Sequence, residues 1–529
     1  MAYHTTLYLI LFLPILLFLY QLTPKKYRYL TLLAGCYYFY FSISGGLIVY
    51  LLAVTLIVHD IGLWIEAERA GCQEQTEGIK EEERLRIGEL SRARHKKIFL
   101  FGILVLLGIL LWKKYYNFAA VNGNRLLELF SMEKSFQIKT IAVPIGLSFF
   151  SLQAVGYLTD VWERKIRAER NLGRLALFLA FFPQIMEGPI CRYEQTAGRL
   201  CEGTPLTMGN LTFGSQRILW GLLKKMLAAD RLHVLVNNVY GNYQSYDGTV
   251  IAVAAVAYTA QLYLEFSGCM DMALGSAELF GVILPENFRR PFFSKSVAEF
   301  WRRWHITLGT WFKDYIFYPV SMSGWVRRIR RKDRLKGNPY LQKMCISAAA
   351  LFPVWFCNGL WHGPRWSYMF FGMYYFVLIL LSTALQPWNE RLCAMLHIRP
   401  SNRIYQLFQI LRTFVLVVIG ELFFRAAGLK IGIDMFLSVL TRFRLSSLWD
   451  GTLLGLGLDI WDFRIIALTV AAVVLVSCLQ ERGIEVRKWT ASLPPRIKWC
   501  IYYGGMIALC LFGAYGTGYS PVDLIYANF

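Results

Sequence analysis

Thirteen apolar runs recur along the chain, separated by shorter polar or charged segments. Seven of them are almost free of charge, at residues 5–22, 46–65, 98–112, 249–264, 366–385, 464–478 and 501–513. Six weaker runs lie near residues 29–43, 140–158, 172–186, 213–235, 344–357 and 404–424. Several runs approach the ~20 apolar residues that a spanning helix needs. The pattern predicts an all-α polytopic membrane protein with about ten to thirteen embedded helices, some of which cross only partly.

The runs divide the chain into three zones of one integral membrane domain. Residues 1–139 carry the amino-terminal transmembrane helices and a charged cytoplasmic loop at 66–97. In residues 140–370, charged and aromatic residues crowd into membrane-like sequence, and residues 371–529 return to hydrophobic helices with short loops. The first run has neither a basic leader nor a small-residue cleavage site, so we interpret it as a transmembrane helix. The sequence shows no internal repeat, which weighs against many transporter architectures.

Composition and charge agree with a membrane protein. Hydrophobic residues make up 56% of the chain and charged residues 17%, with a net charge of +21. We assign the basic excess to cytoplasmic loops and lipid headgroups rather than to nucleic acid. Residues 25–28, 66–97, 164–174 and 327–336 are the expected cytoplasmic segments, and 235–248 is expected outside, which places the amino terminus outside. The eleven cysteines show no metal-type spacing, so we expect neither a metal site nor a disulfide framework.

Residues 265–320 hold too many polar groups for a helix that faces lipid. An unpaired charge at the centre of a membrane helix costs roughly 2.5–3.5 kcal/mol. These groups must therefore face one another, water or a polar ligand. Gly281, Pro285 and Pro291 predict broken or re-entrant backbone, which is tolerated where it lines a cavity or is buried in protein.

A helical pattern follows Pro291 and contains the first of two unusual histidines. Glu299 has the spacing to pair with Arg302 or Arg303 on one helix face. His305 would lie one turn after Arg302 on that face, where the cation would lower the pKa of the imidazole and keep it neutral. The alternative is an interfacial helix whose arginines hold lipid phosphates, with His305 at its rim.

The second unusual histidine is His362, in the sequence "CNGLWHGPRW" between two apolar segments. Of seven histidines, only His305 and His362 lie in settings rich in Trp and Gly and flanked by turn-forming residues. An ionisable group at membrane depth is a candidate for function, although a buried histidine satisfied by a backbone carbonyl is the alternative. We expect Gly359 and Gly363 to admit a thin acyl donor, with Trp361 and Trp366 as walls.

These motifs together resemble the membrane-bound O-acyltransferase family, in the bacterial branch of the alginate O-acetylation membrane protein and the D-alanyl teichoic acid transfer protein. The resemblance rests on "ENFRRPFFSKSVAEFWRRWHITLGTWFKDYIFYP", "NGLWHG", "PQIMEGPICRY", "GLLKKMLAADRL" and "EFSGCMDMALGSAELFG", in the family's order. It covers 140–370 strongly and implies that this zone is a catalytic core around a central funnel. The chain departs from the branch at Glu265, where aspartate is common, and at Cys357 and Asn358.

The resemblance implies acyl transfer from a cytoplasmic thioester, acetyl-CoA, to a hydroxyl presented from the other side of the membrane. We hypothesise that His362 is the general base and that His305 orients the donor or stabilises the oxyanion; a competing mechanism makes His362 a transient acyl carrier. Arg302, Arg303 and Lys313 are candidates to bind the phosphates of coenzyme A. Further candidates for donor or acceptor binding are Asp314, Glu299, Asn287, Asp271, Glu265, Trp304, Trp361 and Asn358. No tightly bound cofactor is expected.

In this branch a secreted or membrane-anchored acetyltransferase completes the reaction. The chain has no G-x-S-x-G motif with which to do so alone, so we expect such a partner. The resemblance implies a multi-pass protein of the bacterial cytoplasmic membrane, with an exopolysaccharide, a cellulose-like glucan, peptidoglycan or a teichoic acid as acceptor. Two alternatives remain open. One is D-alanyl transfer from an acyl-carrier protein to teichoic acid, and the other is a transporter or flippase of a polar substrate.

Overall fold

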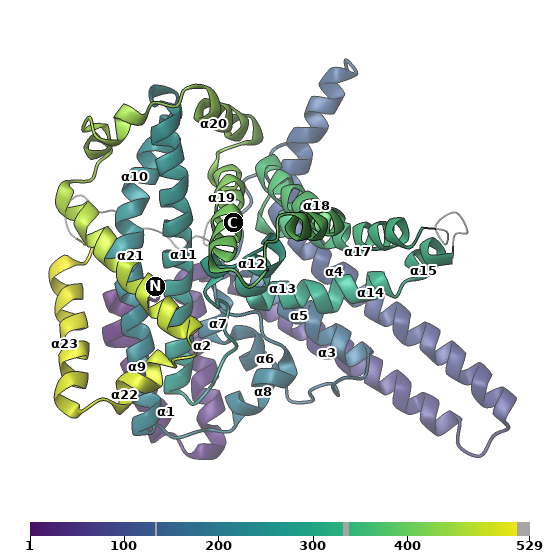
Figure 1. Cartoon of the computed structure of the whole chain (residues 1–529). Coiled ribbons are helices and arrows are strands. Elements are labelled where there is room, and N and C mark those ends of the chain that lie inside the picture. Colours follow the sequence, from purple (N-terminus) through teal and green to yellow (C-terminus); the bar gives the residue numbers. More distant parts are fainter. Residues whose placement is uncertain (133–134, 332–337, 516–529) are drawn as a thin grey trace. The chain divides into compact units, whose positions relative to one another are not determined.

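The chain is an all-α polytopic membrane protein. The computed structural model describes residues 1–132, 135–331 and 338–515, and no strand occurs among them (Figure 1). Seven helical stretches are long and apolar enough to cross a membrane: Lys25–Gln75, Glu81–Leu129, Gly248–Leu279, Pro339–His362, Trp366–Met395, Arg403–Arg425 and Ile460–Glu481. Each of the thirteen apolar runs falls largely on helix, as the hydrophobic pattern predicts.

Residues cluster into two compact units. Within the described residues, the first comprises Met1–Ser215 and Ala273–Pro285, and the second comprises Gln216–Met272 and the residues from Glu286 onward. The helices α9 (Met208–Leu223) and α11 (Gly248–Leu279) contribute residues to both units. This division differs from the three consecutive zones expected from the sequence, because each unit is built from discontinuous segments.

The first unit is built from the amino-terminal helices. They are the π-helix η1 (Leu7–Phe12), α1 (Leu13–Leu22), η2 (Lys25–Tyr27), α2 (Arg28–Ser44), η3 (Gly45–Leu47), α3 (Ile48–Gln75), α4 (Glu81–Leu129), α5 (Leu147–Trp162), α6 (Leu172–Ala180), α7 (Phe182–Ile185) and α8 (Tyr193–Cys201). Helix α3 packs against α4, α5 and α6. The charged connection 66–97 is mostly helical, since α3 runs to Gln75 and α4 begins at Glu81.

An aromatic cluster forms the core of the first unit. The rings of Tyr3, Tyr8, Phe12, Phe39 and Phe182 lie 5.3–6.2 Å apart, in edge-to-face, tilted and stacked pairs. The two tyrosine hydroxyls are satisfied, since Tyr3 donates to the Phe182 carbonyl at 2.6 Å and Tyr8 to the Ser276 hydroxyl at 2.8 Å. Such pairs stabilise a core beyond simple burial.

The second unit contains both histidine motifs. Its helices are the π-helix η4 (Lys224–Ala229), α10 (Asp230–Gly241), η5 (Tyr243–Ser245), η6 (Pro291–Phe293), α12 (Val297–Arg303), α13 (Ile306–Phe312), the π-helix η7 (Lys313–Phe317), α14 (Tyr318–Ser321), α15 (Gly324–Arg331), α17 (Pro339–His362), α18 (Trp366–Met395), α19 (Arg403–Arg425), α20 (Leu429–Thr441), η8 (Leu445–Leu448), η9 (Thr452–Gly455), α21 (Ile460–Glu481), α22 (Val486–Ser492) and α23 (Pro495–Phe512). Helix α17 packs closely on α18, and α12 packs on α18 and α19. The expected cytoplasmic segment 327–336 lies partly outside the described residues.

Irregular backbone separates α11 from α12, as the breakers predict. Helix α11 ends at Leu279, Gly281 has a positive φ of 76°, and the chain forms only the short helix η6 before α12. Helix α12 begins where Ser296 accepts a hydrogen bond from the Glu299 amide at 3.2 Å. The Glu299 carboxylate accepts from the Lys295 amide at 2.9 Å. Ser296 is thus the side-chain N-cap of α12, whereas Glu299 accepts from the amide one residue before the N-cap and not from Ser296 itself as in a capping box.

Glycines set the contact between α17 and α18. A Cβ on Gly359 would lie 2.6 Å from the Tyr368 carbonyl oxygen, and one on Gly372 would lie 2.3 Å from the Trp355 carbonyl oxygen. The expectation that Gly359 makes room for an acyl donor is therefore wrong, because the backbone of α18 occupies that space. The two glycines let the helices approach closely, as small residues do in membrane proteins.

Gly372→Ala should destabilise the protein by about 1–3 kcal/mol, because the added methyl meets rigid backbone. The midpoint of thermal unfolding in detergent would fall accordingly. The control is Gly108→Ala in α4, where a Cβ has no neighbour within 4 Å. Alanine is the better helix former there, so that midpoint should stay equal or rise. An unchanged midpoint for Gly372→Ala would contradict the packing argument.

Candidate active site

His305 lies at the junction between α12 and α13, not on a helix face. Helix α12 ends at Arg303, and His305 occupies the N-cap position of α13 with φ +44° and ψ +52°. This left-handed conformation is unfavourable for a residue with a side chain and is typical of constrained positions. The expected one-turn relation between Arg302 and His305 is therefore wrong, because the helix stops before the histidine.

Asn287 supplies the contacts around this junction. Its backbone carbonyl accepts from the Ile306 amide at 3.0 Å. Its side-chain Oδ1 accepts from the Thr307 amide at 2.9 Å and the Thr307 hydroxyl at 2.8 Å, and lies 3.4 Å from His305 Nδ1. Asn287 and His305 are almost completely buried, at 1% and 2% exposed. A residue eighteen positions upstream thus caps α13.

Burial sets the charge of His305. Its position is outside the seven candidate spans, and loss of hydration lowers the pKa of its imidazole to about 3. The expected neutral form is therefore correct, but the cause is burial rather than the Arg302 cation, and Arg302 is exposed. A neutral imidazole offers one hydrogen-bond donor and one acceptor.

His362 is the last residue of α17 and is 5% exposed. Its ring lies edge-on to Phe424 at 4.9 Å and to Phe371 at 5.6 Å between centroids. The helix ends there because Gly363 takes a φ of 153°, and Pro364 follows. A terminal position turns the imidazole out of the regular helix and into an aromatic environment.

Trp361 joins the two histidines. Its ring centroid lies 5.6 Å from that of His305 and 5.0 Å from that of His362, and the indole is buried. The structure therefore brings together the two histidines that the sequence singles out, although 57 positions separate them in the chain. The other expected wall residue, Trp366, is 52% exposed and does not enclose the site.

Oδ1 of Asn358 and Oε2 of Glu421 are buried and have no hydrogen-bond partner among the described residues. Asn358 precedes His362 by four residues on α17 and so shares its face. Glu421 precedes Phe424, the His362 neighbour, by three residues on α19. A bound substrate with a donor group would satisfy such atoms. The sequence reasoning named Asn358 and missed Glu421, whose signal was a lone acid in an apolar run.

The charged residues of α12 and η7 serve different roles. Arg303 pairs with Glu299 at 2.7 Å, which confirms the expected pair, and with Glu481 of α21 at 2.5 Å. Arg302 and Lys313 have exposed side chains, and the Lys313 ammonium lies 5.5 Å from the centre of the Tyr318 ring. Two of the three expected phosphate ligands therefore present their charge at the surface, while Arg303 is held by carboxylates.

Trp304 and Asp314, the other candidates from this stretch, differ in burial. Trp304 packs edge-on to Phe288 at 5.0 Å and is stacked on Phe300 at 5.4 Å. It is buried, whereas Asp314 is half-buried within η7. The packing of Trp304 gives it a structural role in anchoring the α12–α13 junction.

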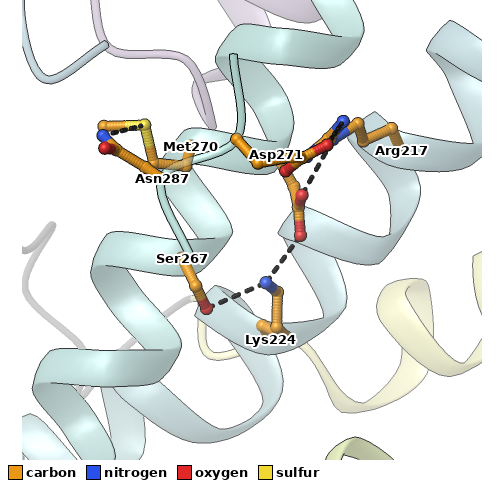
Figure 2. A network of polar contacts seen from close by, with 7 residues as sticks. Arg217, Lys224, Ser267, Met270, Asp271 and Asn287 are labelled. Atoms are coloured by element: carbon orange, nitrogen blue, oxygen red, sulfur yellow. Dashed lines mark hydrogen bonds and ion pairs between the residues drawn. The ribbon is translucent and has the colours of Figure 1, made fainter. Parts of the chain in front are cut away.

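A second polar cluster surrounds Asp271 (Figure 2). One Asp271 oxygen accepts from Arg217 at 2.9 Å, and the other accepts from Lys224 at 2.6 Å. Lys224 also donates to the Ser267 hydroxyl at 2.9 Å. Arg217 grips the carboxylate of Glu286 with both terminal nitrogens, at 2.8 and 2.5 Å. Paired charges of this kind satisfy the need for partners in apolar helices.

Sequence reasoning named Asp271 but missed Arg217, Lys224 and Glu286. The readable signal was the presence of Arg217 and Lys224 within the apolar run 213–235. Glu265, also a candidate, lies 3.6 Å from Lys225, which donates to Asp230 at 2.9 Å. All three side chains are buried, so Glu265 belongs to an internal ion-pair cluster.

A cavity of about 760 Å³ lies beside the Asp271 cluster. Its lining includes the polar residues Arg217, Asp271, Glu286 and Asn287 together with apolar residues of α9, α21 and α23. Asn287 thus contacts both the cavity and the His305 junction. Arg290 lines the cavity and shares Glu481 with Arg303. A mixed wall of this kind suits a long ligand with polar and apolar parts.

Residues 98–331 match the family model "MBOAT, membrane-bound O-acyltransferase family". The chain is 31% identical to a probable alginate O-acetylase of Pseudomonas aeruginosa over 463 residues, which is 86% of this chain and 79% of the relative. It is 27% identical to a peptidoglycan O-acetyltransferase of Helicobacter pylori, over 55% of this chain and 56% of the relative. It is 29% identical to a teichoic acid D-alanyltransferase of Bacillus subtilis, over 52% of this chain and 67% of the relative.

The low pKa of His305 predicts a loss of stability in acid. In the unfolded chain a histidine takes up a proton near pH 6.5, whereas folded His305 stays neutral down to about pH 3. Between these values protons bind the unfolded state more strongly, so this residue destabilises the fold as pH falls below about 6.5. His305→Gln should therefore lose less stability than the parent protein between pH 7.5 and pH 5.5, measured by thermal unfolding in detergent. Equal losses in both proteins would contradict the buried, neutral assignment.

Proposed function

The chain belongs to the membrane-bound O-acyltransferase family, and from this premise we propose that it moves an acetyl group from a cytoplasmic thioester toward the hydroxyl groups of an extracellular polysaccharide. The arrangement of His305 and His362 around Trp361 supports this proposal most directly. Acyl transfer to a hydroxyl needs a base and groups that orient the reactants, and two buried imidazoles beside one indole can supply both. The Pseudomonas aeruginosa relative supports a polysaccharide acceptor, and the protein would act in the bacterial cytoplasmic membrane.

In the proposed reaction His362 takes the proton of the acceptor hydroxyl as its oxygen attacks the thioester carbonyl. The carbon–oxygen bond forms, the carbonyl oxygen becomes an oxyanion, and the carbon–sulfur bond then breaks. The thiolate leaves with the proton that His362 had accepted, so no net proton is gained or lost. A general base in this role contributes typically 10²–10⁴-fold to the rate.

His305 would donate a hydrogen bond to the oxyanion or orient the donor. Its neutral imidazole can do this without moving a proton, and preorganised donors of this type contribute strongly to acyl transfer. Asn358 offers a buried oxygen on the His362 face of α17 for a polar group of the substrate. These roles assign the two histidines different tasks within one site.

We propose acetyl-CoA as the donor, with its pantetheine arm in the 760 Å³ cavity and its phosphates toward Arg302 and Lys313. The cavity supports the placement of the arm, because Asn287 lines it and lies 3.4 Å from His305 Nδ1. A secreted or membrane-anchored acetyltransferase would carry the acetyl group onward to the polymer. The Bacillus subtilis relative keeps D-alanyl transfer from a carrier protein as the second candidate. Family membership favours either enzyme over a transporter.

His362→Ala should reduce acetylation of the surface polymer by 10²-fold or more, because the reaction loses its base. The measurement is polymer acetyl content in a deletion strain that expresses the variant, with membrane insertion verified by blotting. The matched control is His397→Asn, at an exposed position whose positive φ of 53° asparagine tolerates. Normal acetylation by correctly inserted His362→Ala protein would show that His362 is not the general base.

The donor is tested with purified protein in proteoliposomes and radiolabelled acetyl-CoA in the outer solution. Supplying a membrane extract that contains the acetyltransferase partner should cause label transfer, since the thioester would have an acceptor. A D-alanyl-loaded carrier protein in place of acetyl-CoA should cause no transfer. Transfer from the carrier and none from acetyl-CoA would establish the second candidate instead. Acid quenching followed by mass spectrometry would reveal acetylated His362 if that residue carries the acyl group.

A further inference from the structure

The left-handed conformation of His305 has to be held by its surroundings. Residues other than Gly rarely adopt positive φ, and the regular alternative would extend α12 or α13 through this position. His305 is also the N-cap residue of α13, yet its side chain makes no capping hydrogen bond to that helix. The imidazole is thereby directed away from the usual capping role and toward Phe266 and Trp361, whose rings lie 4.9 and 5.6 Å away.

Asn287 performs the capping in place of His305. Its Oδ1 accepts from both the amide and the hydroxyl of Thr307, while its backbone carbonyl accepts from the Ile306 amide. These contacts fix the two residues that follow His305. The same Oδ1 lies 3.4 Å from His305 Nδ1, so a proton on Nδ1 would point at an acceptor and leave Nε2 as a hydrogen-bond acceptor that can orient the acyl donor.

Asn287 is itself fixed from the other side. Its Nδ2 donates to the Met270 sulfur at 3.2 Å (Figure 2). The preceding residue, Glu286, is held by both terminal nitrogens of Arg217, and Arg217 also binds Asp271 of α11. Bidentate contacts of arginine with carboxylates restrain direction as well as distance. Residues 286 and 287 are therefore attached to α9 and α11, and it is Asn287 that contacts His305.

We propose that Asn287 is a positioning residue that holds His305 in its left-handed conformation and sets which ring nitrogen faces the ligand. We further propose that the contacts of Arg217 with Glu286 and Asp271 hold Asn287 in place. The proposal rests on the proposed function only for the part that His305 plays in acyl transfer; the structural coupling stands apart from it.

The first test measures the accessibility of His305 without using activity. Diethyl pyrocarbonate modifies neutral imidazoles, and mass spectrometry of the digested protein gives the rate for each histidine. In the parent protein in detergent, His305 should react slowly because it is 2% exposed. In Asn287→Leu, which keeps the side-chain size but removes both polar atoms, the rate at His305 should rise at least fivefold. In Asn287→Asp, which keeps the acceptor for Thr307, it should stay within twofold of the parent.

Three further variants separate positioning from general destabilisation. Thr307→Val removes one hydroxyl donor at constant shape and should give an intermediate rate, whereas Thr307→Ser should match the parent. Asn171 is the N-cap residue of α6, and its side chain accepts from the Arg174 amide at 3.2 Å. Asn171→Ala removes this cap, which lies outside the candidate site. It should lower the unfolding temperature yet leave the His305 rate unchanged. A parent-like rate at His305 in folded Asn287→Leu overturns the proposal, as does an equal rise in Asn171→Ala.

The second test uses turnover with acetyl-CoA. Asn287→Leu should lower kcat tenfold or more with KM for acetyl-CoA within about twofold, and Asn287→Asp should restore most of kcat. A purely structural role would instead lower the amount of active protein and leave kcat per folded molecule unchanged, which overturns the proposal. If the parent protein shows no turnover, the proposed function fails, while the labelling rates still decide whether Asn287 holds His305.

The role of the ion pairs is tested by Arg217→Gln, which removes the charge and the bidentate contact. The labelling rate at His305 should rise, by less than in Asn287→Leu, because Met270 and Thr307 still hold Asn287. Arg217→Lys keeps the charge but cannot make the bidentate contact, so its labelling rate at His305 should lie between those of Arg217→Gln and the parent. An unchanged rate in Arg217→Gln refutes the second part of the proposal.

Discussion

A charge placed on an apolar helix needs an opposite charge beside it, and this constraint organises the second unit. All four arginine and lysine residues along α9, η4 and α10 meet a carboxylate on another segment, and Lys224 shares Asp271 with Arg217. Arg217 binds Asp271 and Glu286, Lys225 lies beside Glu265, and Arg231 donates to Asp462 at 2.8 Å. These pairs attach the α9–α10 segment to α11, to the loop at residue 286 and to α21. Removing one partner of a buried pair is more damaging than never having the pair, because a charge is left without compensation.

Both histidines lie where regular helix stops, and this follows from what a reactive side chain requires. Inside a continuous helix, the side chains one turn away restrict the directions in which an imidazole can point. His305 occupies a left-handed junction between α12 and α13, and His362 ends α17 before Gly363 and Pro364. Trp361 then packs against both rings. Helix ends in apolar surroundings require that backbone groups find other partners, and Asn287 meets that need at α13.

Periodicity and composition were sufficient for the helices and for local pairs, because these depend on neighbours in sequence. The thirteen apolar runs, the break after α11 and the Glu299–Arg303 pair are features of this kind. The histidine pair was found from its unusual local sequence. Contacts over long separations were out of reach: the role of Gly359 depends on the position of Tyr368, and the cap of α13 comes from Asn287. Arg217 and Lys224 differ from these, since a cation in an apolar run is visible in the sequence, and the missing information was only its partner.

The two histidines are not interchangeable, and the reason lies in proton affinity. A general base works best when its pKa is near the working pH, whereas burial lowers that of His305 to about 3. At neutral pH, His305 therefore holds a proton from a hydroxyl too weakly to act as an efficient base. The same depression makes it a persistent neutral donor, the form that can stabilise an oxyanion without becoming a competing cation. Stabilising an oxyanion requires that Nε2 carry the proton. With the proton on Nδ1 beside the Asn287 oxygen, Nε2 is an acceptor, and His305 orients the acyl donor instead. His362, at the end of α17 beside Phe424, is left as the proton acceptor of the pair.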